Sequence, residues 1–508
     1  MILISIIIFL VSLPILFYLY FTWNFNYWKK RGVNGPEPKF LVGTFPSSYK
    51  GDRNIIYDFE DIYKKYKGKT KYVGVFTGRE PQLLLLAPDI IHDVLVTKFR
   101  NFYDNHVGHL IQCNKKTEIL ALNPFFLKGQ DWKSKRAEVT PALSANRIKS
   151  SYPVMEKVSS KLVDFIREQI QIHGNNYNFD AQEFCQRYTI QTVSDCVYGI
   201  DAGALNSEND SRLLLEARNL VNDFIAGFYK ILLLSPIPFL LKLIPIKLMR
   251  ESGKIFFTNL LRDAISLRKE KQNDRVDFLN YMIQLKDKKV LSDFEMLAHL
   301  MTFFADGFET SASTLANTLL CLGRNQDIQK ELRDEIISNT GSDGSIPFER
   351  LHDLPLLNGC INEALRVLPI LSYTSKICTE ETTFTNYDGT TLKIEKGMPI
   401  HIPTYIVHND EEYYPDPEKY DPERFSPENG GEKKYRDMGV FLPFGDGPRI
   451  CLGQKFGLTQ VKTGLCEVIR NFQVIPSEKT RKDNLIGSAG SLSTLKGGIW
   501  LQFREIKN

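Results

Sequence analysis

Residues 441–453 read FLPFGDGPRICLG, and this stretch carries the strongest structural signal in the chain. Its glycines and prolines fix a tight backbone bend. An apolar pattern with helical spacing begins near Gln454, so Cys451 is predicted just before a helix N-terminus, with Arg449 two residues earlier. Free helix N–H groups and a nearby guanidinium favour an anionic sulfur, so we expect Cys451 to be a thiolate.

A single thiolate in such a loop has two chemical uses. It can act as a nucleophile, which requires a histidine base nearby, or as one axial ligand of a metal cofactor. No histidine follows His408 in the sequence. The residues alone favour the ligand, although a base brought in by the fold leaves the nucleophile open.

Upstream of this loop, the best-marked helix is predicted to begin at Ser292 and to continue to about Gly323. Ser292 and Glu295 form a capping-box pattern, and a helix of this length can cross a whole domain. In its middle, two acids and a hydroxyl interrupt an apolar stretch in the segment Ala305–Ser311. Complete exposure of this segment is disfavoured by its apolar neighbours, so we expect polar chemistry at the middle of the helix.

Length and composition define a large folded chain. It has 508 residues, 43% hydrophobic and 24% charged, with a net charge of +4, which excludes the strong basic field of a dedicated nucleic-acid binder. Eight cysteines without a Cys-x-x-Cys pair indicate reduced thiols, and all except Cys451 are expected to be small core residues. Helical patterns dominate residues 130–370, with short β-like runs at Tyr72–Thr77, Leu83–Leu86 and Pro399–Ile402. The predicted fold class is mainly α with small β-sheets.

The N-terminus reads as a membrane anchor. Ile2–Trp23 is almost continuously apolar and matches the length of a transmembrane helix, and Lys29, Lys30 and Arg31 place the following chain on the cytosolic side. We therefore expect a transmembrane anchor at 1–28, a basic and proline-rich linker at 29–50 and one large domain at 51–508.

A second apolar stretch, Phe224–Ile246, is interrupted by three prolines and cannot form one spanning helix. Short helices that pack in the core or lie on the membrane surface are both consistent with it.

The cysteine loop also carries a family resemblance. Its pattern Phe444-x-x-Gly447-x-Arg449-x-Cys451-x-Gly453 resembles the haem-binding signature of the cytochromes P450. The whole chain is similar to insect microsomal P450s of the xenobiotic-metabolising clan. The resemblance implies the P450 fold and haem b (iron protoporphyrin IX), with Cys451 as the iron ligand and Phe444 in the haem-binding loop.

Further signatures of the family appear in the expected order. Trp132 and Arg136 resemble the pair that binds one haem propionate, and Arg449 would bind the other. Glu363-x-x-Arg366, with Arg424 in a downstream Pro-Glu-Arg-Phe segment, resembles the family's buried charge triad, whose role is structural.

The family resemblance implies functions for the residues of the mid-helix segment Ala305–Ser311. Glu309 and Thr310 resemble the acid–alcohol pair of a proton relay for oxygen chemistry, and Gly307 would let the backbone approach the haem. Asp306 departs from the pattern, because most relatives carry a small residue there, and burial should raise its pKa. It either hydrogen-bonds water and trims the pocket or, like the Glu of the family's fatty-acid hydroxylases, becomes ester-linked to a haem methyl. Tyr373 stands where some relatives place a propionate-binding arginine.

The resemblance implies a monooxygenase that converts RH, O₂, two electrons and two protons into ROH and water. No dinucleotide-binding motif accompanies the cysteine loop, so electrons must come from a partner. The family implies NADPH-cytochrome P450 reductase, with cytochrome b5 as a further donor, at the endoplasmic reticulum membrane with the domain on the cytosolic face. The basic docking face would combine the following lysines: Lys133, Lys135, Lys433, Lys434 and Lys455.

The substrate is expected to be small and apolar: a xenobiotic such as an insecticide or plant toxin, or an endogenous lipid or hormone. Its contacts are assigned loosely to Phe303, Phe304, Ile370 and Leu371. Two other functions remain open. A haem-thiolate isomerase or dehydratase needs no reductase, and a non-enzymatic haem carrier or sensor needs no proton relay.

Overall fold

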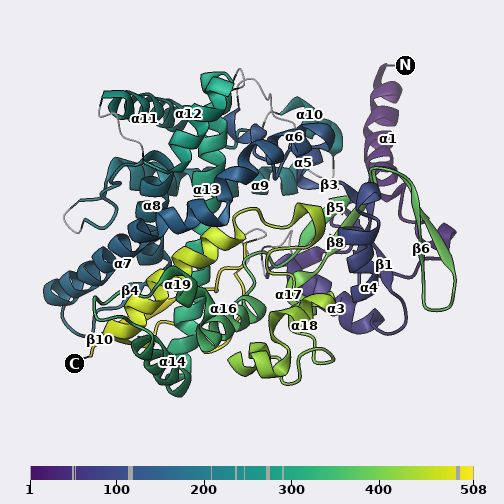
Figure 1. Ribbon diagram of the computed structural model, residues 1–508. Helices are drawn as coiled ribbons and strands as arrows, with labels where there is room; N and C mark the ends of the chain where they lie inside the picture. Colours follow the sequence, from purple (N-terminus) through teal and green to yellow (C-terminus); the bar gives the residue numbers. More distant parts are fainter. Residues whose placement is uncertain are drawn as a thin grey trace.

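Helices make up most of the molecule, and the small sheets lie at two opposite sides of it, one side near each end of the chain (Figure 1). The computed structural model describes residues 2–47, 51, 53–111, 118–206, 209–234, 237–244, 246–270, 275–288, 291–487 and 492–506. The predicted class, mainly α with small sheets, is confirmed. The α-helices are α1 (Ile2–Thr22), α3 (Ile55–Tyr66), α4 (Pro88–His92), α5 (Val107–Leu110), α6 (Gly129–Val139), α7 (Ala145–His173), α8 (Ala181–Tyr198), α9 (Arg212–Leu234), α10 (Pro238–Leu243), α11 (Glu251–Glu270), α12 (Phe278–Lys288), α13 (Asp293–Arg324), α14 (Gln326–Ser338), α15 (Phe348–Asp353), α16 (Pro355–Val367), α17 (Thr404–His408), α18 (Gly431–Asp437) and α19 (Gln454–Asn471).

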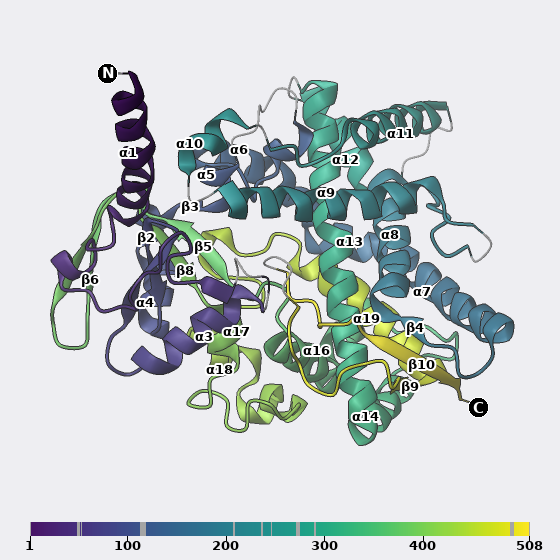
Figure 2. The ribbon, with the colours of Figure 1, turned by 180° about the vertical axis from the view of Figure 1, so that it is seen from behind.

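Helix α13 is the central element, and the elements around it define the core. Its capping box is formed as expected: the Ser292 hydroxyl accepts from the Glu295 N–H, and the Glu295 carboxylate accepts from the Ser292 N–H. From Ser311 to Gly323 every residue is buried, because α8, α16 and α19 pack around this half of the helix. Figure 2 shows α13 running through the full height of the helical part. The site is therefore built on a rigid support.

The largest sheet and the two-stranded sheet lie on the side of the molecule from which α1 projects, whereas the three-stranded sheet lies at the opposite side, near the C-terminus (Figures 1 and 2). The largest has the order β1-β2-β8-β5-β3, a second has the order β4-β10-β9, and β6 pairs with β7. Leu83 of β2 lies opposite Ile400 of β8 in a parallel pair. The strands are β1 (Tyr72–Thr77), β2 (Glu80–Leu85), β3 (Asp104–Asn105), β4 (Phe179–Asp180), β5 (Thr374–Ile377), β6 (Thr382–Thr385), β7 (Thr391–Ile394), β8 (Pro399–Ile402), β9 (Phe472–Pro476) and β10 (Trp500–Glu505).

Three short helical turns position residues of the site: η4 (Ile119–Leu122), η6 (Pro422–Phe425) and η8 (Gly447–Arg449). Turn η4 packs against α13, η6 packs against α16, and η8 belongs to the cysteine loop. The proline-interrupted stretch Phe224–Ile246 is divided between α9 and α10, as its prolines predict.

Helix α1 projects from the body in both views (Figures 1 and 2). Its C-terminal end is held, since the Arg79 guanidinium donates to the Tyr20 carbonyl and Phe21 is buried. Its free end is not covered: Ile2 is 80% exposed and Phe9 is 62% exposed. Among the described residues, however, no helix meets the length and apolarity required to cross a bilayer, so the transmembrane helix stays a prediction.

Candidate functional site

The cysteine loop folds tightly against the start of α19. Gly445 and Gly447 have φ angles of 70° and 67°, which disfavour any residue with a side chain. A Cβ added at Gly447 would lie 2.0 Å from the Leu95 carbonyl oxygen, so only glycine fits there. The Cys451 N–H donates to the Phe444 carbonyl at 2.9 Å, which closes the loop. As a result Cys451 lies just before α19, as the sequence predicts.

Cys451 differs from the other described cysteines, which are all buried, because it is exposed. Cys113 lies outside the described residues. Surrounding protein nevertheless desolvates the thiol. Burial raises the pKa of Cys451, opposed by backbone N–H groups of Gly453 and Gln454 and by the charge of Arg136, while Asp306 raises it further. The thiolate stays a prediction, because coordination to iron would itself stabilise the anionic sulfur.

In the middle of α13, two side chains are exposed although this part of the helix lies in the core. Asp306 and Thr310 are one turn apart on the same face of the helix. The neighbouring Phe304 and Phe308 are buried, and so is the segment that follows Thr310. The Thr310 hydroxyl donates to the Asp306 carbonyl at 2.8 Å, so its oxygen stays available as an acceptor. Since Asp306 acts on the pKa of Cys451, this face of α13 is directed toward the cysteine loop.

Gly307 has a different role from the expected one. A Cβ at this position would lie 3.3 Å from Cγ2 of Val193, which belongs to α8. The glycine therefore allows α8 to pack closely on α13. The expectation that it opens space for the haem is not supported, because the added atom would point at α8. The Gly307 carbonyl accepts from the Gln460 amide at 2.8 Å, which ties α13 to α19.

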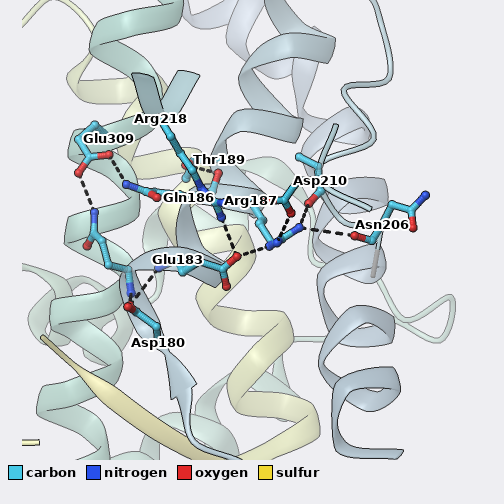
Figure 3. A network of polar contacts seen from close by, with 11 residues as sticks. Asp180, Glu183, Gln186, Arg187, Thr189, Asn206, Asp210, Arg218 and Glu309 are labelled. Atoms are coloured by element: carbon cyan, nitrogen blue, oxygen red, sulfur yellow. Dashed lines mark hydrogen bonds and ion pairs between the residues drawn. The ribbon is translucent and has the colours of Figure 1, made fainter. Parts of the chain in front are cut away.

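Glu309 is turned toward α8 and is held there by two amides. The Gln182 and Gln186 side chains donate to its two carboxylate oxygens at 2.8 and 2.7 Å, and Figure 3 shows Glu309 and Gln186 facing each other. Burial raises the pKa of Glu309, and the two glutamines partly oppose this. Glu309 makes no hydrogen bond to Thr310 in the described structure, so the pair is adjacent but not connected.

A cluster of basic groups lies beside the cysteine loop. The Arg449 guanidinium lies 4.1 Å from the centre of the Trp132 ring and 3.4 Å from a carboxylate oxygen of Asp104. It also donates to the carbonyls of Tyr103, Pro124 and Leu127. Arg136 donates to the Ile450 carbonyl at 2.8 Å. Burial lowers the pKa of Arg449 to about 10.

Lys376 is a further basic group in this cluster. Its ammonium donates to the Asn105 side chain at 2.8 Å. Burial lowers its pKa to about 7, and the charges of Arg449 and Arg136 add to this effect. Tyr373 does not belong to the cluster, because its ring packs against Phe59.

The donor set fits a dianionic prosthetic group. Two basic side chains, Arg449 and Lys376, interact with the carboxylate of Asp104, and the positive charge of Arg136 acts on both of them. Such an excess of buried positive charge is costly unless anions compensate it, and the two propionates of haem do so. The sulfur of Cys451 would supply the metal ligand. The residues present therefore fit haem at this site.

The predicted charge triad is assembled between α16 and η6. Two nitrogens of Arg366 lie 2.7 and 2.8 Å from the two oxygens of Glu363, and both side chains are fully buried. Arg424 lies 3.4 Å from Glu363. Arg366 also donates to the carbonyls of His408 and Pro417, so each of its three guanidinium nitrogens has a hydrogen-bond acceptor.

The four residues expected to contact the substrate differ in their burial and in their neighbours. Phe304 is fully buried among the rings of Tyr198, Phe257 and Phe308, on the face of α13 opposite Asp306, so it offers no surface to a substrate. Phe303 is half-buried and packs on Phe278 and Phe456. Ile370 is buried and Leu371 half-buried, in the segment between α16 and β5. The structure therefore does not bring Phe304 to the site.

Sequence reasoning missed four residues of the site: Asn123 on Asp306, the two glutamines on Glu309, and Lys376 in the basic cluster. Each is distant in sequence from the group it serves or forms no pattern with it. Only Lys376 carried a usable signal, namely a lysine inside an otherwise uncharged strand.

These features define a protein that binds haem through a cysteine thiolate. The family model described as Cytochrome P450 matches residues 33–502. The chain is 42% identical to "Probable cytochrome P450 28d1" of Drosophila melanogaster over 96% of each chain. It is 40% identical to "Probable cytochrome P450 28a5" of that fly, over 98% of this chain and 99% of the relative, and 32% identical to its "Cytochrome P450 6a2", over 97% of each. The chain belongs to the cytochrome P450 family. It is an oxidoreductase of the monooxygenase class, and its cofactor is haem b.

Proposed function

We propose that this chain oxidises small apolar substrates, either xenobiotics such as insecticides or plant toxins or endogenous lipids or hormones. The proposal rests on three residues, Cys451, Asp306 and Thr310, which are exposed although the helices beside or around them pack in the core. Haem b bound there by a thiolate activates O₂, so that one oxygen atom enters the substrate and the other leaves as water.

The chain's own residues have four tasks in this proposal. Cys451 binds the iron, and the N–H groups of Gly453 and Gln454 stabilise its negative charge. Trp132, Arg136, Arg449 and Lys376 hold the propionates. Phe444 and the Glu363–Arg366–Arg424 triad keep the loop and the core beneath it in position.

Proton delivery is assigned to Thr310 and Glu309. The Thr310 oxygen, whose hydrogen is donated to the Asp306 carbonyl, can accept from a water and fix its position. The two glutamines donate to both oxygens of Glu309 and oppose the rise of its pKa on burial, so they ease the release of its proton.

Asp306 has two proposed states. The Asn123 amide lies 3.0 Å from both carboxylate oxygens, which supports the hydrogen-bonded state over an ester with a haem methyl. Haem extracted with acidified solvent after turnover should therefore be unmodified. Haem that stays with the polypeptide under these conditions would establish the ester instead.

Electrons are proposed to come from NADPH through cytochrome P450 reductase, with cytochrome b5 as a second donor. Lys133, Lys433, Lys434 and Lys455 are exposed and can contribute to a basic docking face. Lys135 contributes less, because its ammonium is paired with Glu138 and Glu295.

The proposed location is the endoplasmic reticulum membrane, with the haem domain on the cytosolic face. Support comes from the uncovered apolar side chains of α1 and from the basic residues that follow it.

One experiment tests the function against its alternatives. The purified protein should show the carbon-monoxide difference band of a reduced haem thiolate, and with reductase and substrate it should consume NADPH and form hydroxylated product. Cys451→Ser should abolish both results. Product rearrangement without NADPH would establish an isomerase or dehydratase. Haem binding without NADPH consumption would establish a carrier or sensor.

A further inference from the structure

Asp306 is held by one neutral donor. The Asn123 amide nitrogen lies 3.0 Å from each of its carboxylate oxygens. Asn123 is buried at the end of η4, and its own side-chain oxygen accepts from the Phe125 N–H at 2.8 Å. The amide is thus fixed by the backbone of a neighbouring element, with its N–H₂ group presented to Asp306.

Asp306 lacks the basic partner that several other deep carboxylates have. Glu363 is paired with Arg366, Asp104 with Arg449, and Asp277 with Arg268. Among the described residues, no lysine, arginine or histidine forms an ion pair with Asp306. Glu309 also has no basic partner, but its two oxygens are occupied by glutamines and it is turned toward α8. Asp306 alone presents an uncompensated carboxylate on the exposed face.

This carboxylate is ionised in neutral solution while water reaches it. Burial raises its pKa to about 6, and the Asn123 hydrogen bonds act in the opposite direction. A neutral ligand that displaces the water would leave the carboxylate without compensation, whereas a cationic ligand would replace the missing counter-charge.

We propose that Asp306 selects organic cations, so that the preferred substrates have an apolar body and a protonated or quaternary nitrogen. The inference rests on the proposed monooxygenase function and names its substrate class. Asn123 is the positioning residue, since it fixes the carboxylate on the exposed face of α13.

The test compares two ligands of the same shape. Benzyltrimethylammonium carries a permanent charge and cannot ligate iron, and neopentylbenzene replaces its nitrogen with carbon. Both are titrated into the full-length, haem-loaded protein, with binding followed by equilibrium dialysis and by the Soret band. Asp306→Asn removes the charge, Asp306→Glu keeps it, and Glu428→Gln is the matched control, because it removes an exposed carboxylate of a distant turn.

The wild type should bind the cation more tightly than the hydrocarbon. The ratio of the two dissociation constants should fall by about tenfold in Asp306→Asn and persist in Asp306→Glu and Glu428→Gln. Tighter binding of neopentylbenzene by the wild type would overturn the proposal without any variant, and so would an unchanged ratio in Asp306→Asn. If the wild type lacks the carbon-monoxide difference band, the proposed function fails. A band with no preference for the cation rejects only the role of Asp306.

Discussion

At the scale of single residues, Gly445 and Gly447 of the cysteine loop allow the cost of a strained backbone to be measured apart from the cost of a steric clash. Both have positive φ angles, but a Cβ at Gly447 would meet the Leu95 carbonyl at 2.0 Å, whereas a Cβ at Gly445 meets no atom within 4 Å. Gly445→Ala should therefore cost about 1 kcal/mol, the cost of a left-handed backbone. Gly447→Ala should cost several times more and prevent haem loading. Haem content and thermal unfolding check both variants, and equal losses would contradict the steric argument.

Lys376 predicts an unusual pH dependence for the haem-free chain. Its pKa is about 7 in the folded state, against 10.5 for a free lysine. Between these values the unfolded chain binds more protons, so the free energy of unfolding should rise with pH from about 7 to about 10. Lys376→Met should flatten this rise and stabilise the haem-free chain at pH 7 by on the order of 3 kcal/mol. Denaturant titrations at several pH values measure the slope.

Haem loading supplies the control for Lys376. A propionate beside the ammonium would raise the pKa of Lys376 and weaken the pH dependence in the loaded wild type. A slope that is identical with and without haem would place the propionates elsewhere.

At the scale of elements, the pairing of α8 with α13 sets the position of Glu309. Gln186→Leu removes one of its two donors, so the pKa of Glu309 should rise further and its proton should be released less readily. We expect a larger solvent deuterium isotope effect and more peroxide per NADPH consumed.

Gln191→Leu is the matched control for this prediction. Gln191 is a buried glutamine of the same helix, but it donates to Asp201 at 2.8 Å and does not contact Glu309. A similar change in both variants would indicate a general disturbance of α8 and would reject the specific role of Gln186.

The same pair of helices shows which features of the site can be predicted from the sequence and which cannot. The start of α13, its central position and the common face of Asp306 and Thr310 follow from a local capping pattern and from helical spacing, and the structure contains all three. The partners of these residues do not follow, because Gln182 and Asn123 come from segments more than 120 residues away. The desolvation of Cys451 does not follow from the sequence either, for a related reason. Helix geometry is local, whereas desolvation depends on everything packed around the sulfur.

At the scale of the whole molecule, α1 and α10 lie toward the same side of the body in both ribbon views (Figures 1 and 2). On α10, Phe239 is 63% exposed and Leu243 is 60% exposed. The free end of α1 is equally uncovered. Exposed apolar side chains gathered on one side are typical of a membrane-contacting surface. Of the two interpretations of the proline-interrupted stretch, this arrangement favours contact with the membrane.

Membrane attachment should therefore have two separable parts. Deleting residues 2–19 keeps the Tyr20 and Phe21 contacts that hold the start of the body, so the truncated chain should retain its carbon-monoxide difference band. It should also remain partly bound to phospholipid vesicles through α10, because each buried large apolar side chain contributes about 1.5–3 kcal/mol. Adding Phe239→Ser and Leu243→Ser should release it into the supernatant after vesicle flotation. The same two substitutions in the full-length chain should have little effect, since α1 alone would hold it. Complete release by the deletion alone would show that α10 does not contact lipid.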